Sequence, residues 1–201
     1  MKKFLSISLV AASLLVLSSC DEKAKLASSV AGSWSGSAER VETSDTKATT
    51  TVTRILNFIP DSGSKTGGTL DAVAEFSIEN GTQLQATDTQ PISVTASGNA
   101  TISGRWEAID DDEIMVSFDS KSLKINVDPQ EVVLEYTIST ETSQPVDQTM
   151  TDAAVASITR TMTAAMNHTV FNFGKLDDIK ITGNLMSVEI GKKDFTYHRE
   201  M

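Results

Sequence analysis

The sequence is poor in cysteine, histidine and aromatic residues, and each shortage narrows the chemistry open to the protein. Cys20 is the only cysteine, so no disulfide can form within the chain and the fold must depend on its hydrophobic core. The two histidines, His168 and His198, show neither the His-x-His nor the Glu-x-x-His spacing of a zinc site. Aromatic residues make up 5% of the chain, which argues against a carbohydrate site built on broad stacking surfaces.

Motifs with a known catalytic mechanism are also missing. The sequence contains no Gly-x-Ser-x-Gly turn of the kind that presents a nucleophilic serine. A calcium site is one interpretation of Asp110-Asp111-Asp112-Glu113, but this run lacks the alternating ligands and the glycine of an EF-hand loop. A solvated acidic hairpin turn is the simpler interpretation. We therefore expect a protein that is not an enzyme, holds no metal and uses no cofactor.

The first nineteen residues have the pattern of a signal peptide. Lys2 and Lys3 precede an apolar run from Phe4 to Leu17, which is too short for a membrane span of about 20 residues. The run ends at Leu17-Ser18-Ser19-Cys20, which resembles the lipobox of bacterial lipoproteins. That resemblance implies cleavage before Cys20 and attachment of lipid to its thiol, so the protein would meet the membrane through this lipid. The alternative is an ordinary signal peptide followed by a chance cysteine.

The charge of the exported part excludes one class of partner. Loss of residues 1–19 removes two lysines and no acids, which leaves 15 basic and 27 acidic residues and a net charge of −12. Such a charge repels nucleic acid and anionic lipid headgroups. We therefore expect no nucleic-acid partner, and membrane attachment through lipid instead of through a basic surface.

Two acidic residues follow the cysteine and bear on location in the cell envelope. Asp21 and Glu22 resemble the surface-export signal of Bacteroidetes lipoproteins, whereas Asp at the first position resembles an inner-membrane retention signal of enterobacteria. Of the two, we favour the outer membrane. Residues 20–29 then form a short lipidated tether, and residues 30–201 form a single domain of a size that can bury a sizeable core.

Most of this domain shows the alternation of strands that have one face on a core. The clearest case is 70–78, and 100–108, 114–118, 123–127 and 132–138 repeat it. Weaker strands are expected at 34–43, 49–59 and 91–97, and four more at 170–173, 179–181, 186–190 and 195–197. Turn signals, among them Ser97-Gly98-Asn99, separate these segments. The pattern predicts an all-β fold, an antiparallel meander of strands.

One late segment departs from this alternation. Apolar residues recur every four positions at Met150, Ala154, Ile158, Met162 and Met166, which predicts an α-helix over about 149–167. Its many threonines lower its intrinsic helix propensity, so we expect it to depend on packing against the sheet.

A short motif at the start of the domain carries a resemblance to a known family. Gly32-Ser33-Trp34 resembles the Gly-x-Trp motif on the first strand of lipocalins and wider calycins, and Gly104-Arg105-Trp106 echoes it. Together with the lipobox, the chain looks like the lipocalin-like lipoproteins of the Bacteroidetes. The resemblance implies that the meander closes into a lipocalin-like β-barrel whose closed end is plugged by Trp34. The Thr-Asp-Tyr motif of lipocalins is absent, and a β-sandwich is the alternative fold.

The resemblance also implies a function. The barrel interior would hold a small apolar or amphipathic ligand, and the inward-facing residues of two strands would line it: Leu70, Ala72, Phe76, Ile78, Ile102 and Trp106. The alternative is a non-catalytic surface or accessory lipoprotein that acts through contacts with another protein or an envelope polymer. This second hypothesis predicts a filled barrel and an exposed contact patch.

Overall fold

The structure is a computed structural model, and it describes residues 22–43, 48–81, 92–136 and 148–200. The long strands are β3 (Thr49–Pro60), β4 (Gly67–Gly81) and β5 (Ile92–Ala108). Shorter strands come before and after them: β1 (Gly32–Gly36), β2 (Glu39–Val41), β6 (Ile114–Phe118), β7 (Lys124–Val127), β8 (Val133–Tyr136), β9 (Lys175–Thr182), β10 (Leu185–Ile190) and β11 (Lys193–Arg199). The helix α2 (Gln148–Ala165) continues into the π-helical turn η3 (Met166–Val170), and residues 22–30 form a helix before β1.

The strands form one antiparallel sheet that closes on itself. Its order is β1-β11-β10-β9-β6-β5-β4-β3, and β3 pairs again with β1. At the point of closure, Trp34 of β1 lies opposite Arg199 of β11 on one side and opposite Leu56 of β3 on the other. These pairings make a barrel of eight strands, so the predicted β-barrel is confirmed and the β-sandwich is excluded.

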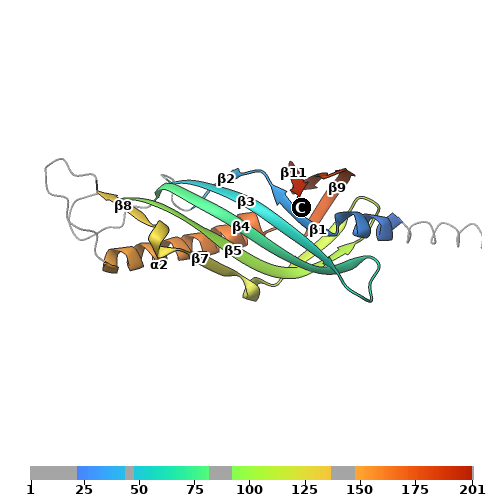
Figure 1. Cartoon of the computed structure of the whole chain (residues 1–201), viewed down its shortest axis with the longest axis horizontal. Coiled ribbons are helices and arrows are strands. Elements are labelled where there is room, and N and C mark those ends of the chain that lie inside the picture. The colour runs from blue at the N-terminus through green and yellow to red at the C-terminus, as the bar shows by residue number, and fades with distance from the viewer. Residues whose placement is uncertain (1–21, 44–47, 82–91, 137–147, 201) are drawn as a thin grey trace, which may run out of the picture.

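The three long strands extend beyond the closed part of the barrel. In this extension β2 pairs with the beginning of β3, while β7 and β8 pair with the beginning of β5. Figure 1 shows α2 running alongside this half of the molecule, with the helix of residues 22–30 at the opposite end. The molecule therefore has a closed half and an open half, and α2 covers the open one.

Side chains alternate along the long strands as the sequence predicts. The inward positions of β3 and β4 are buried, and the outward positions are partly or fully exposed. The inward residues of β5 join them in a single core together with the buried face of α2, Ala154, Ile158 and Met162. Burial of apolar surface on this scale is the main stabilising term of a fold without disulfides.

Two details of the predicted elements are wrong. Ser97-Gly98-Asn99 is not a turn, because β5 runs through it without interruption. Glycine is required there, since a β-carbon on Gly98 would lie 2.7 Å from the ring of Phe76 and 2.4 Å from the carbonyl oxygen of Asn126. Residues 170–173 are not a strand either, since η3 ends at Val170 and β9 begins at Lys175. In η3, the wider π-helical turn keeps Met166 and Val170 buried after the α-helix ends.

The segment expected to be a tether is a packed helix. In residues 22–30, Leu26, Ala27 and Val30 are buried against the core, and their spacing is that of one helical face. The carbonyl oxygen of Val30 accepts a hydrogen bond of 2.7 Å from the indole nitrogen of Trp34. The helix and Trp34 therefore close one end of the barrel together.

Arg199 joins the helix to the last strand at the same end. Its guanidinium lies over the Trp34 ring at 4.2 Å and donates hydrogen bonds of 2.6 Å to the carbonyl oxygens of Ala31 and Ser29. The Ser29 carbonyl belongs to the last turn of the helix and the Ala31 carbonyl follows it, and acceptors at a helix end lack partners within the helix. One arginine thus holds the tryptophan, the helix end and β11 in place.

Candidate functional site

The six residues that the sequence analysis assigns to a ligand site all face the interior. Leu70, Ala72, Phe76 and Ile78 lie on β4, while Ile102 and Trp106 lie on β5. All six are buried in the common core, and Trp106 packs edge-to-face on Phe58 with ring centres 5.5 Å apart. Their inward direction agrees with the alternation, and their role in ligand binding stays a prediction.

A groove lies on the side of the barrel, next to β11. It forms because β1 ends at Gly36, while the following strand β2 pairs with β3. The groove has a volume of about 690 Å³ and is lined by β2, β3, residues 169–175 and the β10–β11 hairpin. A hollow of about 310 Å³ adjoins it, and the two share Glu39, Arg54 and Phe195. We call the groove and this hollow together the lateral groove.

Arg54 is the central residue of the lateral groove. It occupies an inward position on β3, where its side chain is only 5% exposed. Its Nη2 lies 2.7 Å from Oε1 of Glu39 on β2, and its guanidinium carbon lies 4.3 Å from the ring centre of Phe195 and 5.9 Å from that of Phe173. A cation removed from water in this way requires a charged partner and polarisable neighbours.

Tyr197 provides a second unusual polar group. It lies on β11, it is almost completely buried, and its hydroxyl has no hydrogen-bond partner. Burial raises the pKa of this phenol to about 12, and the charges of Arg54 and Glu39 act on it with opposite signs. The hydroxyl is therefore a neutral donor at physiological pH, close enough to the Arg54–Glu39 pair to be affected by both charges.

The walls of the lateral groove combine apolar and basic side chains. Val170, Phe173, Ile190 and Phe195 supply the apolar part. Seven charged residues line it, four basic and three acidic: Arg40, Arg54, Lys175, Lys193, Glu39, Glu42 and Asp194. Basic residues therefore outnumber acidic residues in the lining, although acidic residues outnumber basic ones in the whole chain. Such a combination suits a molecule with an apolar part and an anionic part.

The sequence analysis did not identify this site, although one signal for it is present. Within 49–59 the inward positions read Thr50, Val52, Arg54, Leu56 and Phe58, so a charged residue interrupts an otherwise mainly apolar face. A charge at such a position is uncommon and indicates either a buried ion pair or a binding site. The contributions of β2, β11 and residues 169–175 depend on the tertiary fold.

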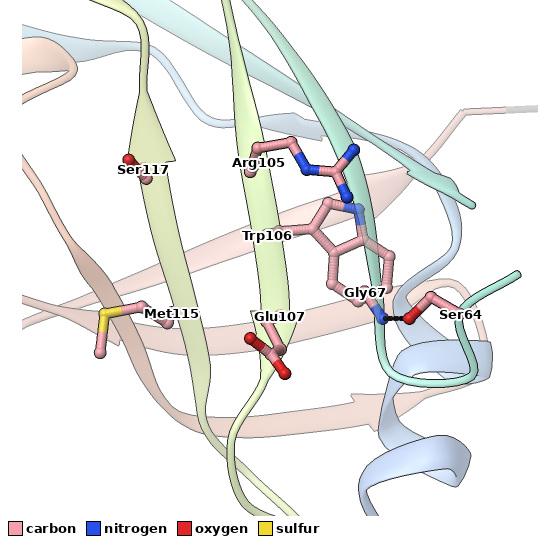
Figure 2. A pocket seen from close by; sticks show the side chains of 7 residues that line it. All are labelled: Ser64, Gly67, Arg105, Trp106, Glu107, Met115 and Ser117. Carbon is pink, nitrogen blue, oxygen red and sulfur yellow. Dashed lines mark hydrogen bonds between the residues drawn. The ribbon is translucent and has the colours of Figure 1, made fainter.

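A shallower hollow lies on the outside of β5 and β6. Figure 2 shows its seven lining residues, with Arg105, Glu107, Met115 and Ser117 on neighbouring strands. Its volume is about 350 Å³. Arg105 forms an ion pair with Asp61, which raises the pKa of Arg105, and Ser64 accepts a hydrogen bond of 3.1 Å from the backbone nitrogen of Gly67. The outward polar groups here pair mainly with one another, so we favour the lateral groove as the site.

The histidines do not line the lateral groove, and the acidic run meets it through Glu113, which pairs with the lining residue Lys175. Asp112 lies in the β5–β6 turn. Its pKa is raised first by desolvation and then by the neighbouring carboxylates, of which Asp111 has the largest effect. Lys175 bridges Glu113 at 2.8 Å and Asp177 at 3.1 Å. Both histidines are exposed. Within the described ranges, no three histidine, cysteine or acidic residues are arranged to hold a metal ion.

Comparison of the chain with family models, curated proteins and solved structures finds no significant match. Across the part of the chain that the structure describes, no helix combines the length and the apolar character needed to cross a membrane. The fold and the lateral groove therefore carry the functional argument by themselves. They define an antiparallel eight-stranded barrel with a groove on its side.

Proposed function

We propose that the protein is an exported lipoprotein, anchored in the cell envelope by lipid on Cys20, that binds a small amphipathic molecule. The anchoring part rests on the signal pattern and the lipobox. The binding part rests on the lateral groove, whose larger part has a volume of about 690 Å³, within the range of about 300–1,000 Å³ of small-molecule sites. No reaction is proposed, because the lateral groove pairs no nucleophile with a general base.

The proposed ligand site is the lateral groove, whereas the sequence predicts a site in the barrel interior. One end of the barrel interior is closed by Trp34 and the helix of residues 22–30, and the open half is covered by α2. The lateral groove reaches Arg54 on the inner face of β3 from the side. A ligand would therefore enter between β2 and β11, without displacing either helix.

Native mass spectrometry of the chain from residue 21 onward tests this proposal, because this chain keeps every described residue. We expect a mass excess that disappears when the same sample is denatured. In the variant Gly174→Phe, the new side chain should fill the groove and remove the excess. The substitution is tolerable because the nearest atom to a β-carbon on Gly174 is 3.9 Å away.

Gly63→Phe is the matched control. A β-carbon on Gly63 meets nothing within 4 Å, and the residue lies in the exposed turn before β4, away from the groove. It should retain the mass excess. An excess that persists in Gly174→Phe would contradict the groove as the site. A chain that binds nothing, even when amphiphiles are added, would favour the accessory-lipoprotein alternative.

A further inference from the structure

The Arg54–Tyr197 pair indicates which part of a ligand the lateral groove recognises. Arg54 uses Nη2 for Glu39 at 2.7 Å, and its guanidinium carbon lies 4.3 Å from the ring centre of Phe195. Tyr197 lines the same hollow, and its buried hydroxyl has no hydrogen-bond partner among the described residues. A buried donor without an acceptor has lost its hydration without compensation. Arg54 and Tyr197 line the same hollow, so its cation and its unpaired hydroxyl are together complementary to an anionic acceptor that a ligand would supply.

We propose that the lateral groove binds an amphiphile through a single oxyanion head, a carboxylate or a phosphate monoester, held by Arg54 and Tyr197. This inference rests on the proposed function and specifies its ligand class. The apolar tail would lie along Phe173, Phe195 and Val170, which line the larger part of the groove. Arginine suits such heads because its planar guanidinium donates two parallel hydrogen bonds to one anion.

Glu39 competes with the ligand for Arg54. Its carboxylate occupies the position beside Nη2 at 2.7 Å, and its side chain is 31% exposed. Glu39 lies on β2, a strand of three residues at the edge of the sheet. Its carboxylate can rotate into water, and the head of the ligand then takes its place. In the free protein Glu39 compensates the buried charge of Arg54.

Glycine at position 36 makes room for this arrangement. A β-carbon there would lie 3.0 Å from Cε1 of Tyr197 and 3.3 Å from the carbonyl oxygen of Arg54. The absence of a side chain lets the phenol ring lie flat against β1, so that Tyr197, Arg54 and Glu39 all line the same small hollow.

The test compares undecanoate, decyl phosphate and the neutral analogue decanol by isothermal titration calorimetry. The three probes share one tail, so a difference in affinity reports the head. We expect at least one of the two anions to bind about ten-fold more tightly than decanol, as a charge-assisted hydrogen bond predicts. The two anions then distinguish a carboxylate from a phosphate as the preferred head.

Tyr197→Phe is the decisive variant, because it removes only the hydroxyl that lacks a partner. We expect it to weaken binding of the preferred anion about ten-fold, to weaken binding of decanol by less, and to fold at least as stably as the original chain. Glu39→Gln should strengthen anion binding, since it removes the competing carboxylate. Arg54→Met should reduce anion affinity to that of decanol. Tyr136→Phe, at the other tyrosine, is the matched control.

The outcomes separate this inference from the proposed function. Equal binding of all three probes that Gly174→Phe abolishes would leave the groove as a ligand site and overturn recognition of the anion. Anion preference that survives both Tyr197→Phe and Arg54→Met would also overturn it. Failure of all three probes to bind the original chain would count against the proposed function itself.

Discussion

At the scale of single residues, titration with alkali can measure the burial of Tyr197. In the unfolded chain its phenol would ionise near its usual pKa of 10.0, whereas burial raises the pKa in the folded state to about 12. Below the lower value both states are neutral, so the phenol contributes no pH dependence. Between the two values only the unfolded state ionises, and folding stability falls as the pH rises.

We expect this fall to amount to about 2–3 kcal/mol by the upper end of that range, at 1.36 kcal/mol per pKa unit. Urea unfolding at a series of alkaline pH values, compared between the original chain and Tyr197→Phe, isolates the effect from the titration of lysines. In a Tyr136→Phe chain, the ultraviolet absorbance of phenolate follows Tyr197 alone, since the protein has two tyrosines. A normal phenol titration in the folded state would contradict the burial.

For single residues, the sequence predicted which face of a strand a side chain lies on better than it predicted which residues that side chain contacts. The alternation of 70–78 and 100–108 correctly placed Leu70 and Trp106 toward the interior, because a strand turns successive side chains to opposite faces. The motif Gly32-Ser33-Trp34 suggested a plug, and Trp34 is indeed fully buried at one end of the barrel. Its contacts with Arg199 and Val30 lie outside what any local pattern can show.

At the scale of elements, the helix of residues 22–30 is the part most different from expectation. We predict that Leu26→Ala lowers the free energy of unfolding by about 2–3 kcal/mol, because it removes a buried side chain and leaves a cavity. Ser28→Ala, on the exposed side of the same helix, should change it by less than about 0.5 kcal/mol. Urea denaturation measures both free energies of unfolding. Equal stability of the two variants would indicate that residues 22–30 are a tether that does not pack on the core.

The errors at the element scale have a common physical cause. A glycine between two small polar residues is typical of a turn, yet Gly98 lies within β5 because Phe76 and Asn126 occupy the space that a side chain would need. In 170–173, β-branched and aromatic residues favour a strand, but the segment completes the helical connection to β9. In both places tertiary packing outweighed local propensity.

At the scale of the whole molecule, the proposed anchor predicts where the protein is found. We expect the full chain to take up labelled palmitate and to fractionate with membranes, and Cys20→Ser to do neither, because it lacks the thiol that accepts the lipid. Ser19→Ala is the matched control, since it keeps a small residue before the cysteine. Membrane association that is unchanged in Cys20→Ser would contradict anchoring by lipid.

The same proposal orients the barrel. Only Asp21 separates Cys20 from the helix of residues 22–30, and two residues of chain span at most about 7 Å. A lipid on Cys20 would therefore hold the end of the barrel closed by Trp34 nearer to the membrane than the end covered by α2. The lateral groove, on the side of the barrel, would remain accessible in this orientation.

The sequence by itself determined the fold class, the inward faces of the long strands and the late helix, since these depend on local periodicity. Only the tertiary structure decided the closure of the sheet, the use of residues 22–30 as a cap and the lateral groove. Arg54, Glu39 and Tyr197 belong to three strands far apart in the chain. Their meeting follows from barrel closure, which joins the first strands to the last and which no local pattern encodes.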